Sequence, residues 1–99
     1  MSAETGVCEL LSASHRDPLT GQLHGHTWKV TVWTAGEPLR DGRVLKERLK
    51  GLLSAWDHDV LPDQLASGEA ICTAIAQLLG DCTEVLVERA EGHMARWRP

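Results

Sequence analysis

The stretch Leu23-His24-Gly25-His26-Thr27-Trp28-Lys29-Val30-Thr31-Val32-Trp33 decides the architecture of this chain. From Thr27 onward, β-branched and aromatic residues dominate and apolar positions alternate with polar ones, which predicts a strand. Side chains two positions apart point to the same face of a strand, so His24 and His26 are expected to lie side by side. Gly25 between them leaves the backbone open to close approach.

A third histidine, His15, ends the preceding run Val7-Cys8-Glu9-Leu10-Leu11-Ser12-Ala13-Ser14. If that run is also a strand, residues 16–23 connect a hairpin, with turn residues at Asp17-Pro18 and Thr20-Gly21. The hairpin would bring His15 beside the His24/His26 pair. Three neutral imidazoles with one open position are the ligand set of a catalytic zinc, so the sequence predicts a zinc site here.

Length and composition indicate one small domain over residues 1–99. Apolar residues make up 42% of the chain, enough for a core, and four tryptophans occur without phenylalanine or tyrosine. Tryptophans outside the core are typical of an oligomeric interface. The formal charge of −4 and the lack of a basic run argue against nucleic acid or an anionic membrane as the main partner.

The three cysteines, Cys8, Cys72 and Cys82, have no metal-binding spacing and are expected to be free thiols in a reducing cytoplasm. Glu4 and Glu9 lie where a signal peptide would need positive charge and then an apolar run. No apolar run approaches the roughly 20 residues of a membrane span. We therefore expect a cytoplasmic protein without a membrane partner.

The remaining helices and strands are predicted from the periodicity of apolar residues and from turn and capping residues. Strands are expected at 6–15 and 24–35, a loop at 36–42, and an amphipathic helix at about 43–55. After a loop at 57–63, Ser67 is a good N-cap for a second helix, which Gly80 ends. Strands at 84–88 and 93–98 complete the order ββααββ, an α+β fold with a four-stranded antiparallel sheet.

This layout and three motifs resemble the tunnelling fold (T-fold), specifically the 6-pyruvoyl-tetrahydropterin synthase / 6-carboxy-tetrahydropterin synthase family. The motifs are Ser12-Ala13-Ser14-His15, Leu23-His24-Gly25-His26 and Trp56-Asp57-His58-Asp59-Val60-Leu61, and Ser67-Gly68-Glu69 and Val87-Glu88 are further similarities. The resemblance implies two helices on one face of the sheet and a homo-oligomer, a trimer or hexamer, closed into a barrel. It places active sites at subunit boundaries, and we expect Trp28, Trp33 and Trp97 to bury the seams.

The resemblance also implies residue roles. His15, His24 and His26 would hold zinc, Asp57 and His58 would relay protons as catalytic residues, and Glu88 would bind the pterin ring. Each role has a simpler alternative. The three histidines could be ordinary surface residues, Asp57 and His58 could belong to a polar loop at a helix end, and Glu88 could be a solvent-facing strand end. Glu69 is expected to favour the helix N-terminus, and His93 has no matching role.

The main departure from the family is at Thr20, which occupies the position of the usual cysteine, four residues before His24. A threonine hydroxyl cannot become a base unaided, so Thr20 is expected to be a substrate-binding residue that hydrogen-bonds a zinc-bound oxygen. The resemblance implies a zinc-dependent lyase or cyclase acting on 7,8-dihydroneopterin triphosphate or a related small heterocycle. The alternatives are a repurposed T-fold enzyme with another small-molecule reaction and a non-catalytic zinc- or pterin-binding oligomer.

Overall fold

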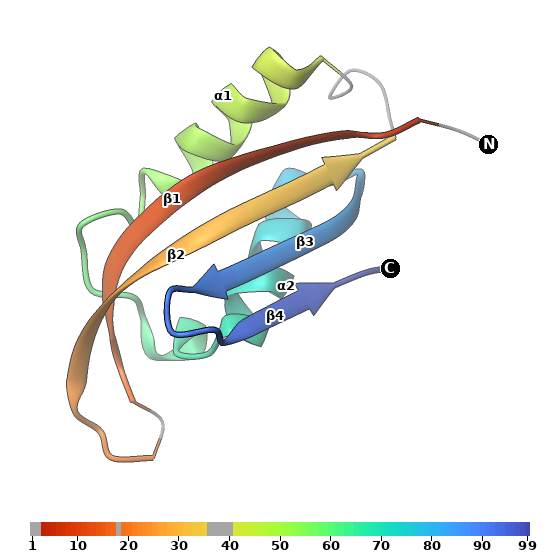
Figure 1. Cartoon of the computed structure of the whole chain (residues 1–99). Coiled ribbons are helices and arrows are strands. Elements are labelled where there is room, and N and C mark those ends of the chain that lie inside the picture. Colours follow the sequence, from red (N-terminus) through yellow and green to blue (C-terminus); the bar gives the residue numbers. More distant parts are fainter. Residues whose placement is uncertain (1–2, 18, 36–40) are drawn as a thin grey trace.

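Two long strands form a hairpin that dominates the molecule (Figure 1). The computed structural model describes residues 3–17, 19–35 and 41–99, with β1 at Thr5–Arg16 and β2 at Leu23–Thr34. They pair antiparallel from Thr5↔Thr34 to Arg16↔Leu23. Both predicted strands are confirmed, whereas the predicted turn residue Pro18 and positions 36–40 of the predicted loop lie outside the described residues.

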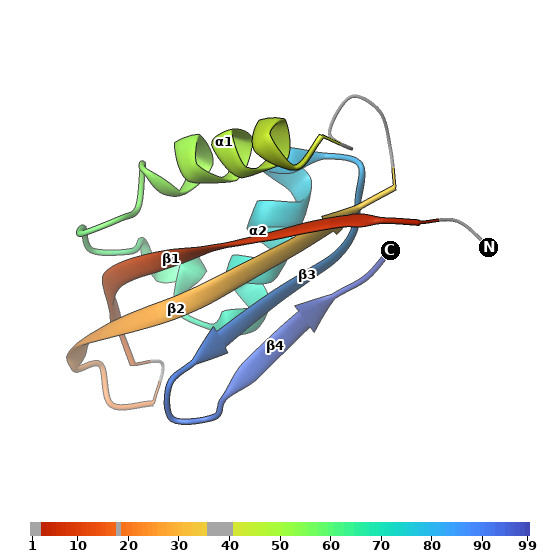
Figure 2. The same cartoon turned by 45° about the horizontal axis from the view of Figure 1, so that its top comes forward.

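Two shorter strands extend the sheet on the β2 side (Figure 2). β3 spans Cys82–Arg89 and β4 spans Met94–Trp97, and the order β1-β2-β3-β4 is antiparallel throughout. The far end of the β1–β2 hairpin, which carries the three histidines, projects beyond β3 and β4 (Figure 1).

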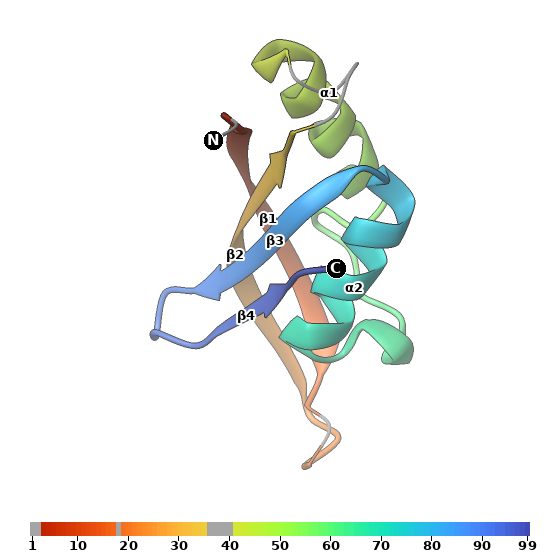
Figure 3. The same ribbon diagram turned by 90° about the vertical axis from the view of Figure 1, so that its right-hand side faces the viewer.

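Two helices cover one face of this sheet (Figure 3). α1 spans Gly42–Leu53, and the carboxylate of Asp41 caps it by accepting from the backbone N–H of Arg43. α2 spans Gly68–Leu79, and the Ser67 hydroxyl accepts from the N–H of Ala70, as the sequence predicts for this cap. A 3₁₀ turn at Asp63–Leu65, labelled η1, was not predicted. No helix in the described parts of the chain is long and apolar enough to cross a membrane.

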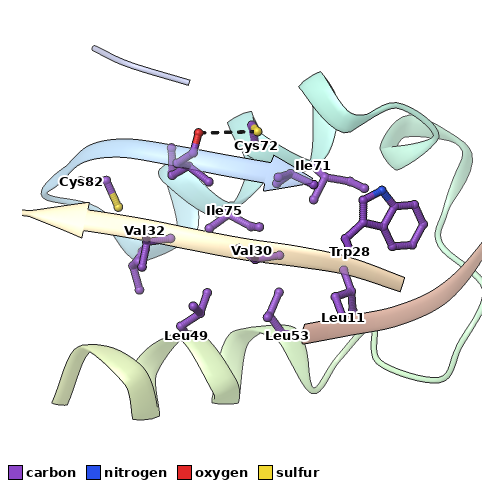
Figure 4. Packing of buried hydrophobic residues seen from close by; sticks show 14 of the residues in the cluster. Leu11, Trp28, Val30, Val32, Leu49, Leu53, Ile71, Cys72, Ile75 and Cys82 are labelled. Atoms are coloured by element: carbon purple, nitrogen blue, oxygen red, sulfur yellow. Dashed lines mark hydrogen bonds between the residues drawn. The ribbon is translucent and has the colours of Figure 1, made fainter. Parts of the chain in front are cut away.

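The core lies between the sheet and the helices (Figure 4). Sheet residues meet apolar residues of both helices there, and the fully buried side chains include Leu11, Val30, Val32, Leu45, Leu49, Ile71, Ile75, Val85 and Val87. Trp28 belongs to this core with only 2% of its surface exposed, so the prediction that it buries a subunit seam is wrong. Trp33, 38% exposed, remains available for a seam.

Candidate active site

The hairpin register brings the three predicted histidines to one face of the sheet. His15 is paired with His24, and His26 is paired with Ala13, two residues before His15 on β1. Directly paired residues and residues two apart share a face, so all three rings meet. The ring centroids of His15 and His26 are 4.9 Å apart, and His24 lies 6.3 Å from His15 and 6.1 Å from His26.

His15 is held in one orientation and has one nitrogen without a partner. Its side chain is 5% exposed, and Nδ1 lies 2.7 Å from the backbone oxygen of Ala66. Because a carbonyl oxygen can only accept, Nδ1 carries the proton and donates it. Nε2 is then a free lone pair, and it is buried without any hydrogen-bond partner. A metal-binding histidine has this arrangement, with its other nitrogen fixed by an outer partner.

The other two rings are partnered at the hairpin end. His26 Nε2 accepts from the Arg89 guanidinium at 3.2 Å, and His26 Nδ1 lies 3.5 Å from the Glu91 carboxylate. Burial, and then the nearby Arg89 charge, lower the pKa of His26, which favours the neutral ring. His24 is more exposed, and its Nε2 lies 3.8 Å from the Asp17 carboxylate.

Three imidazoles are the donor set of a catalytic zinc, and the geometry comes close to it, but His26 Nε2 must release its hydrogen bond from Arg89 before it can bind a metal. Around a tetrahedral zinc with Zn–N of about 2.0–2.1 Å, ring centroids would be about 5 Å apart. The His15–His26 pair has that spacing, whereas His24 is about 1 Å farther out than a closed site needs. Among the described residues, no group of three or more His, Cys, Asp or Glu side chains is arranged to hold a metal ion as it stands.

The predicted Asp57–His58 pair sits directly after α1, at the edge of β1. One Asp57 carboxylate oxygen accepts from the backbone N–H of Ser12 at 2.9 Å, and the other lies 2.9 Å from His58 Nδ1. His58 has a left-handed backbone with φ of 61°, and its N–H donates to the Ser12 carbonyl at 2.5 Å. The Ser12 N–H and then His58 lower the pKa of Asp57, so the carboxylate stays ionised and orients the imidazole.

Asp57 and His58 lie mainly on the other face of the hairpin from the three histidines. His58 is 81% exposed in its side chain and opens on a cavity of about 470 Å³, called here the His58 cavity. Its walls include Ser12 and Thr27, whose side chains alternate along their strands with those of the histidine face. His26 also lies in its wall, so the His58 cavity reaches one histidine of the cluster, whereas His15 and His24 do not line it.

Thr20 is occupied within its own turn. Its N–H donates to the Asp17 carboxylate at 3.1 Å, and its hydroxyl oxygen accepts from the N–H of Gln22 at 3.2 Å. The Leu19 and Thr20 N–H groups lower the pKa of Asp17, so this turn is organised by a carboxylate. Thr20 is exposed and does not line the cavity beside the histidines.

Glu88, predicted to bind the ring of a pterin, lies on the other face of the sheet. It is paired with the exposed Lys29, whereas the next residue, Arg89, is paired with the buried Trp28. Arg89 therefore shares the face of the histidines. The signal was present in the sequence, because Val85, Val87 and Arg89 alternate on one face of a strand.

A second cavity of about 620 Å³, called here the His15 cavity, lies on the histidine side. Its walls include His15, Trp28, Ser67, Gly68, Arg89 and His93. It thus joins the hairpin, the start of α2 and the β3–β4 turn. This is a concave site with a few converging polar groups, the ordinary form of a small-molecule site.

The fold, with its four-stranded antiparallel sheet and two helices on one face, is the T-fold. The model of the family "6-pyruvoyl tetrahydropterin synthase" matches residues 9–96, and the chain belongs to this family. A protein of Archaeoglobus fulgidus, proposed to be a 6-carboxy-5,6,7,8-tetrahydropterin synthase, is 30% identical over 86 residues, covering 77% of this chain and 75% of the relative.

Solved structures agree on the fold. The 6-pyruvoyl tetrahydropterin synthase of Caenorhabditis elegans superposes with a TM-score of 0.71 at 16% identity, covering 98% of this chain and 95% of that one. The corresponding Plasmodium falciparum enzyme gives 0.62 at 16% identity, with 98% of both chains covered. At this identity the likeness concerns the arrangement of the chain.

Proposed function

We propose that this chain is a zinc-dependent lyase of the pterin-synthase type, acting on 7,8-dihydroneopterin triphosphate or a related small heterocycle. The observation that carries the proposal is the Nε2 atom of His15, buried and without a partner beside two further imidazoles. A buried polar atom without a partner costs stability, about 1–3 kcal/mol, and a ligand would relieve it. Family membership makes a catalytic ligand the natural candidate.

In this proposal His15, His24 and His26 hold the zinc. When bound, zinc supplies a Lewis acid that polarises a substrate oxygen and stabilises enolate-like negative charge. The Ala66 carbonyl keeps the proton of His15 on Nδ1, so that Nε2 is ready to ligate. His58 exchanges protons at Nε2 while Asp57 holds its Nδ1–H.

The proposal also requires a homo-oligomer, a trimer or hexamer. The His58 cavity includes His26 but neither His15 nor His24, and His58 does not line the His15 cavity, so His58 from one subunit would complete the histidine cluster of another. Trp33 and the half-buried Trp97 are the seam candidates that remain. Free thiols at all three cysteines are consistent with the proposed cytoplasmic location.

A complementation experiment tests this arrangement. His15→Ala is expected to be inactive and His58→Ala to lose about a hundredfold in turnover. Refolding them together should raise activity above either variant, because some boundaries then carry both intact groups. His15→Ala refolded alone and His58→Ala refolded alone serve as controls. A mixture that forms oligomers and stays inactive would contradict a site shared between subunits.

A second candidate function is another small-molecule reaction on the same site, or binding without turnover. Two observations favour it: Thr20 is occupied in its own turn, and Arg89 rather than Glu88 faces the His15 cavity. Incubation with 7,8-dihydroneopterin triphosphate, followed by product mass and triphosphate release, separates the candidates. A zinc-bearing oligomer that leaves this compound unchanged would overturn the leading proposal in favour of the second.

A further inference from the structure

Arg89 is a charged residue in the wall of the His15 cavity. It lies at the end of β3 with its side chain 22% exposed. Its guanidinium donates to His26 Nε2 at 3.2 Å and to His93 Nδ1, and its Nε lies 3.1 Å from the Glu91 carboxylate. A guanidinium has five N–H donors, so these three contacts leave two for a ligand.

Arg89 is the main positive charge in the wall of this cavity. Among the described residues that line it, Arg89 is the one with a permanent positive charge. Two carboxylates also line it. Asp17 is held by the Leu19 and Thr20 N–H groups at the hairpin end, and Glu69 is exposed on the first turn of α2.

One further feature of the cavity points to a ligand with negative charge. The start of α2, at Gly68, lies in its wall, and a helix N-terminus carries a partial positive charge. His15 lies in the same wall, but its unpartnered Nε2 is a lone pair that only accepts, so it serves the metal of the proposed function and does not bind an anion. A guanidinium and a helix N-terminus therefore line one space.

We infer that Arg89 is a specificity-determining residue that binds an anionic group, a carboxylate or a phosphate, on the small-molecule ligand of this cavity. The inference rests on the proposed function for the presence of a ligand there. A planar guanidinium matches a carboxylate or phosphate with parallel N–H···O bonds. It cannot pair with the donor edge of a guanidine-like ring, because both groups offer only N–H donors. Arg89 therefore binds the acidic group of the ligand and does not bind the donor edge of a ring.

Glu91 provides an internal test of this assignment. Its carboxylate is 47% exposed and already neutralises part of the Arg89 charge. An incoming anion must compete with it for the same guanidinium. Removing the Glu91 charge should therefore strengthen anion binding, whereas removing the Arg89 charge should weaken it.

Calorimetric titration of the zinc-replete protein tests the inference with three probes: inorganic phosphate, benzoate and isocytosine, whose ring has a guanidine-like donor edge. The native chain should bind at least one anion and bind it more tightly than isocytosine. The anion with the higher affinity, phosphate or benzoate, indicates whether the acidic group of the ligand is a phosphate or a carboxylate. Arg89→Gln should weaken that anion by roughly tenfold to a hundredfold, the loss of a charged hydrogen bond, and Glu91→Gln should tighten it by about two- to fivefold. Arg98→Gln, which removes an exposed arginine paired with Glu84, should change nothing.

Circular dichroism checks that each variant is folded, and Arg89→Lys provides a second variant that keeps the charge and should retain part of the affinity. Unchanged anion binding in folded Arg89→Gln, no anion binding by the native chain, or tighter binding of isocytosine would each overturn the inference. Zinc content and turnover are measured separately. A protein with zinc and turnover but no anion binding refutes this inference alone. One that binds the anion through Arg89 but leaves 7,8-dihydroneopterin triphosphate unchanged refutes the proposed function alone.

Discussion

Replacing His15 by leucine separates the metal-binding role of this residue from its role in the core. The imidazole is buried, donates to the Ala66 carbonyl and leaves Nε2 without a partner. The unpartnered nitrogen destabilises the native fold by about 1–3 kcal/mol, and leucine relieves this cost. Leucine also leaves the Ala66 carbonyl without its donor, which destabilises the fold by a similar amount. The two effects nearly cancel, so metal-free His15→Leu should be as stable as the metal-free native chain within about 1 kcal/mol.

Zinc should change this balance in the native chain only. A ligand at one hundred times its Kd stabilises the folded state by about 2.7 kcal/mol. For a domain of this size, 1 kcal/mol corresponds to about 4–8 °C in Tm. We therefore expect zinc to raise the Tm of the native chain by about 10–20 °C over the chelator-treated protein, and to leave that of His15→Leu unchanged.

Differential scanning fluorimetry with zinc or chelator, together with elemental analysis of bound metal, measures both quantities. His58→Gln is the matched control, because it removes an exposed imidazole outside the cluster and should keep the full zinc-dependent shift. A zinc-dependent shift that survives in His15→Leu would refute the role of His15. A native chain whose Tm ignores zinc would refute the zinc site as a whole.

Three further predictions concern the groups around the site. Thr20→Ala should change turnover little, because the hydroxyl is occupied in its turn, whereas His58→Ala should lower it about a hundredfold with zinc content intact. The reverse pattern in steady-state kinetics would contradict the assignment. The pKa of Asp57 is lowered in the folded chain, so its stabilisation is present above the ordinary value of about 3.9 and is lost as pH falls through the folded value. Asp57→Asn should accordingly be less stable than the native chain at pH 7 and approach it near pH 3 in urea unfolding, and an equal difference at both pH values would refute this. Burial raises the pKa of the Cys72 thiol to about 11, so a disulfide reagent at pH 8 should label exposed Cys8 quickly and Cys72 only after unfolding.

The element order and the metal-ligand candidates could be predicted from the sequence because they depend on local periodicity. Alternation along β2 places His24 and His26 on one face, and a hairpin necessarily returns His15 to the same end. The Ser67 cap and the apolar stripe of α2 are equally local signals. The phase of β3 was available in the same way: the alternation of Val85 and Val87 includes Arg89 and leaves Glu88 out.

The tertiary structure decided which surroundings each of these residues has. The Nε2 atom of His15 is unprotonated because Nδ1 donates to the carbonyl of Ala66, 51 positions away. No local sequence pattern predicts that contact. Trp28 is in the core rather than at a seam because it lies on the face of the sheet that the helices cover, within the buried apolar cluster. His58 opens on a cavity that includes His26 but not His15 or His24, because the segment after α1 bonds to the edge of β1, with Asp57 and His58 both anchored on the Ser12 backbone. Periodicity sets the direction of a side chain relative to its own strand or helix, whereas long-range packing determines what lies on that side.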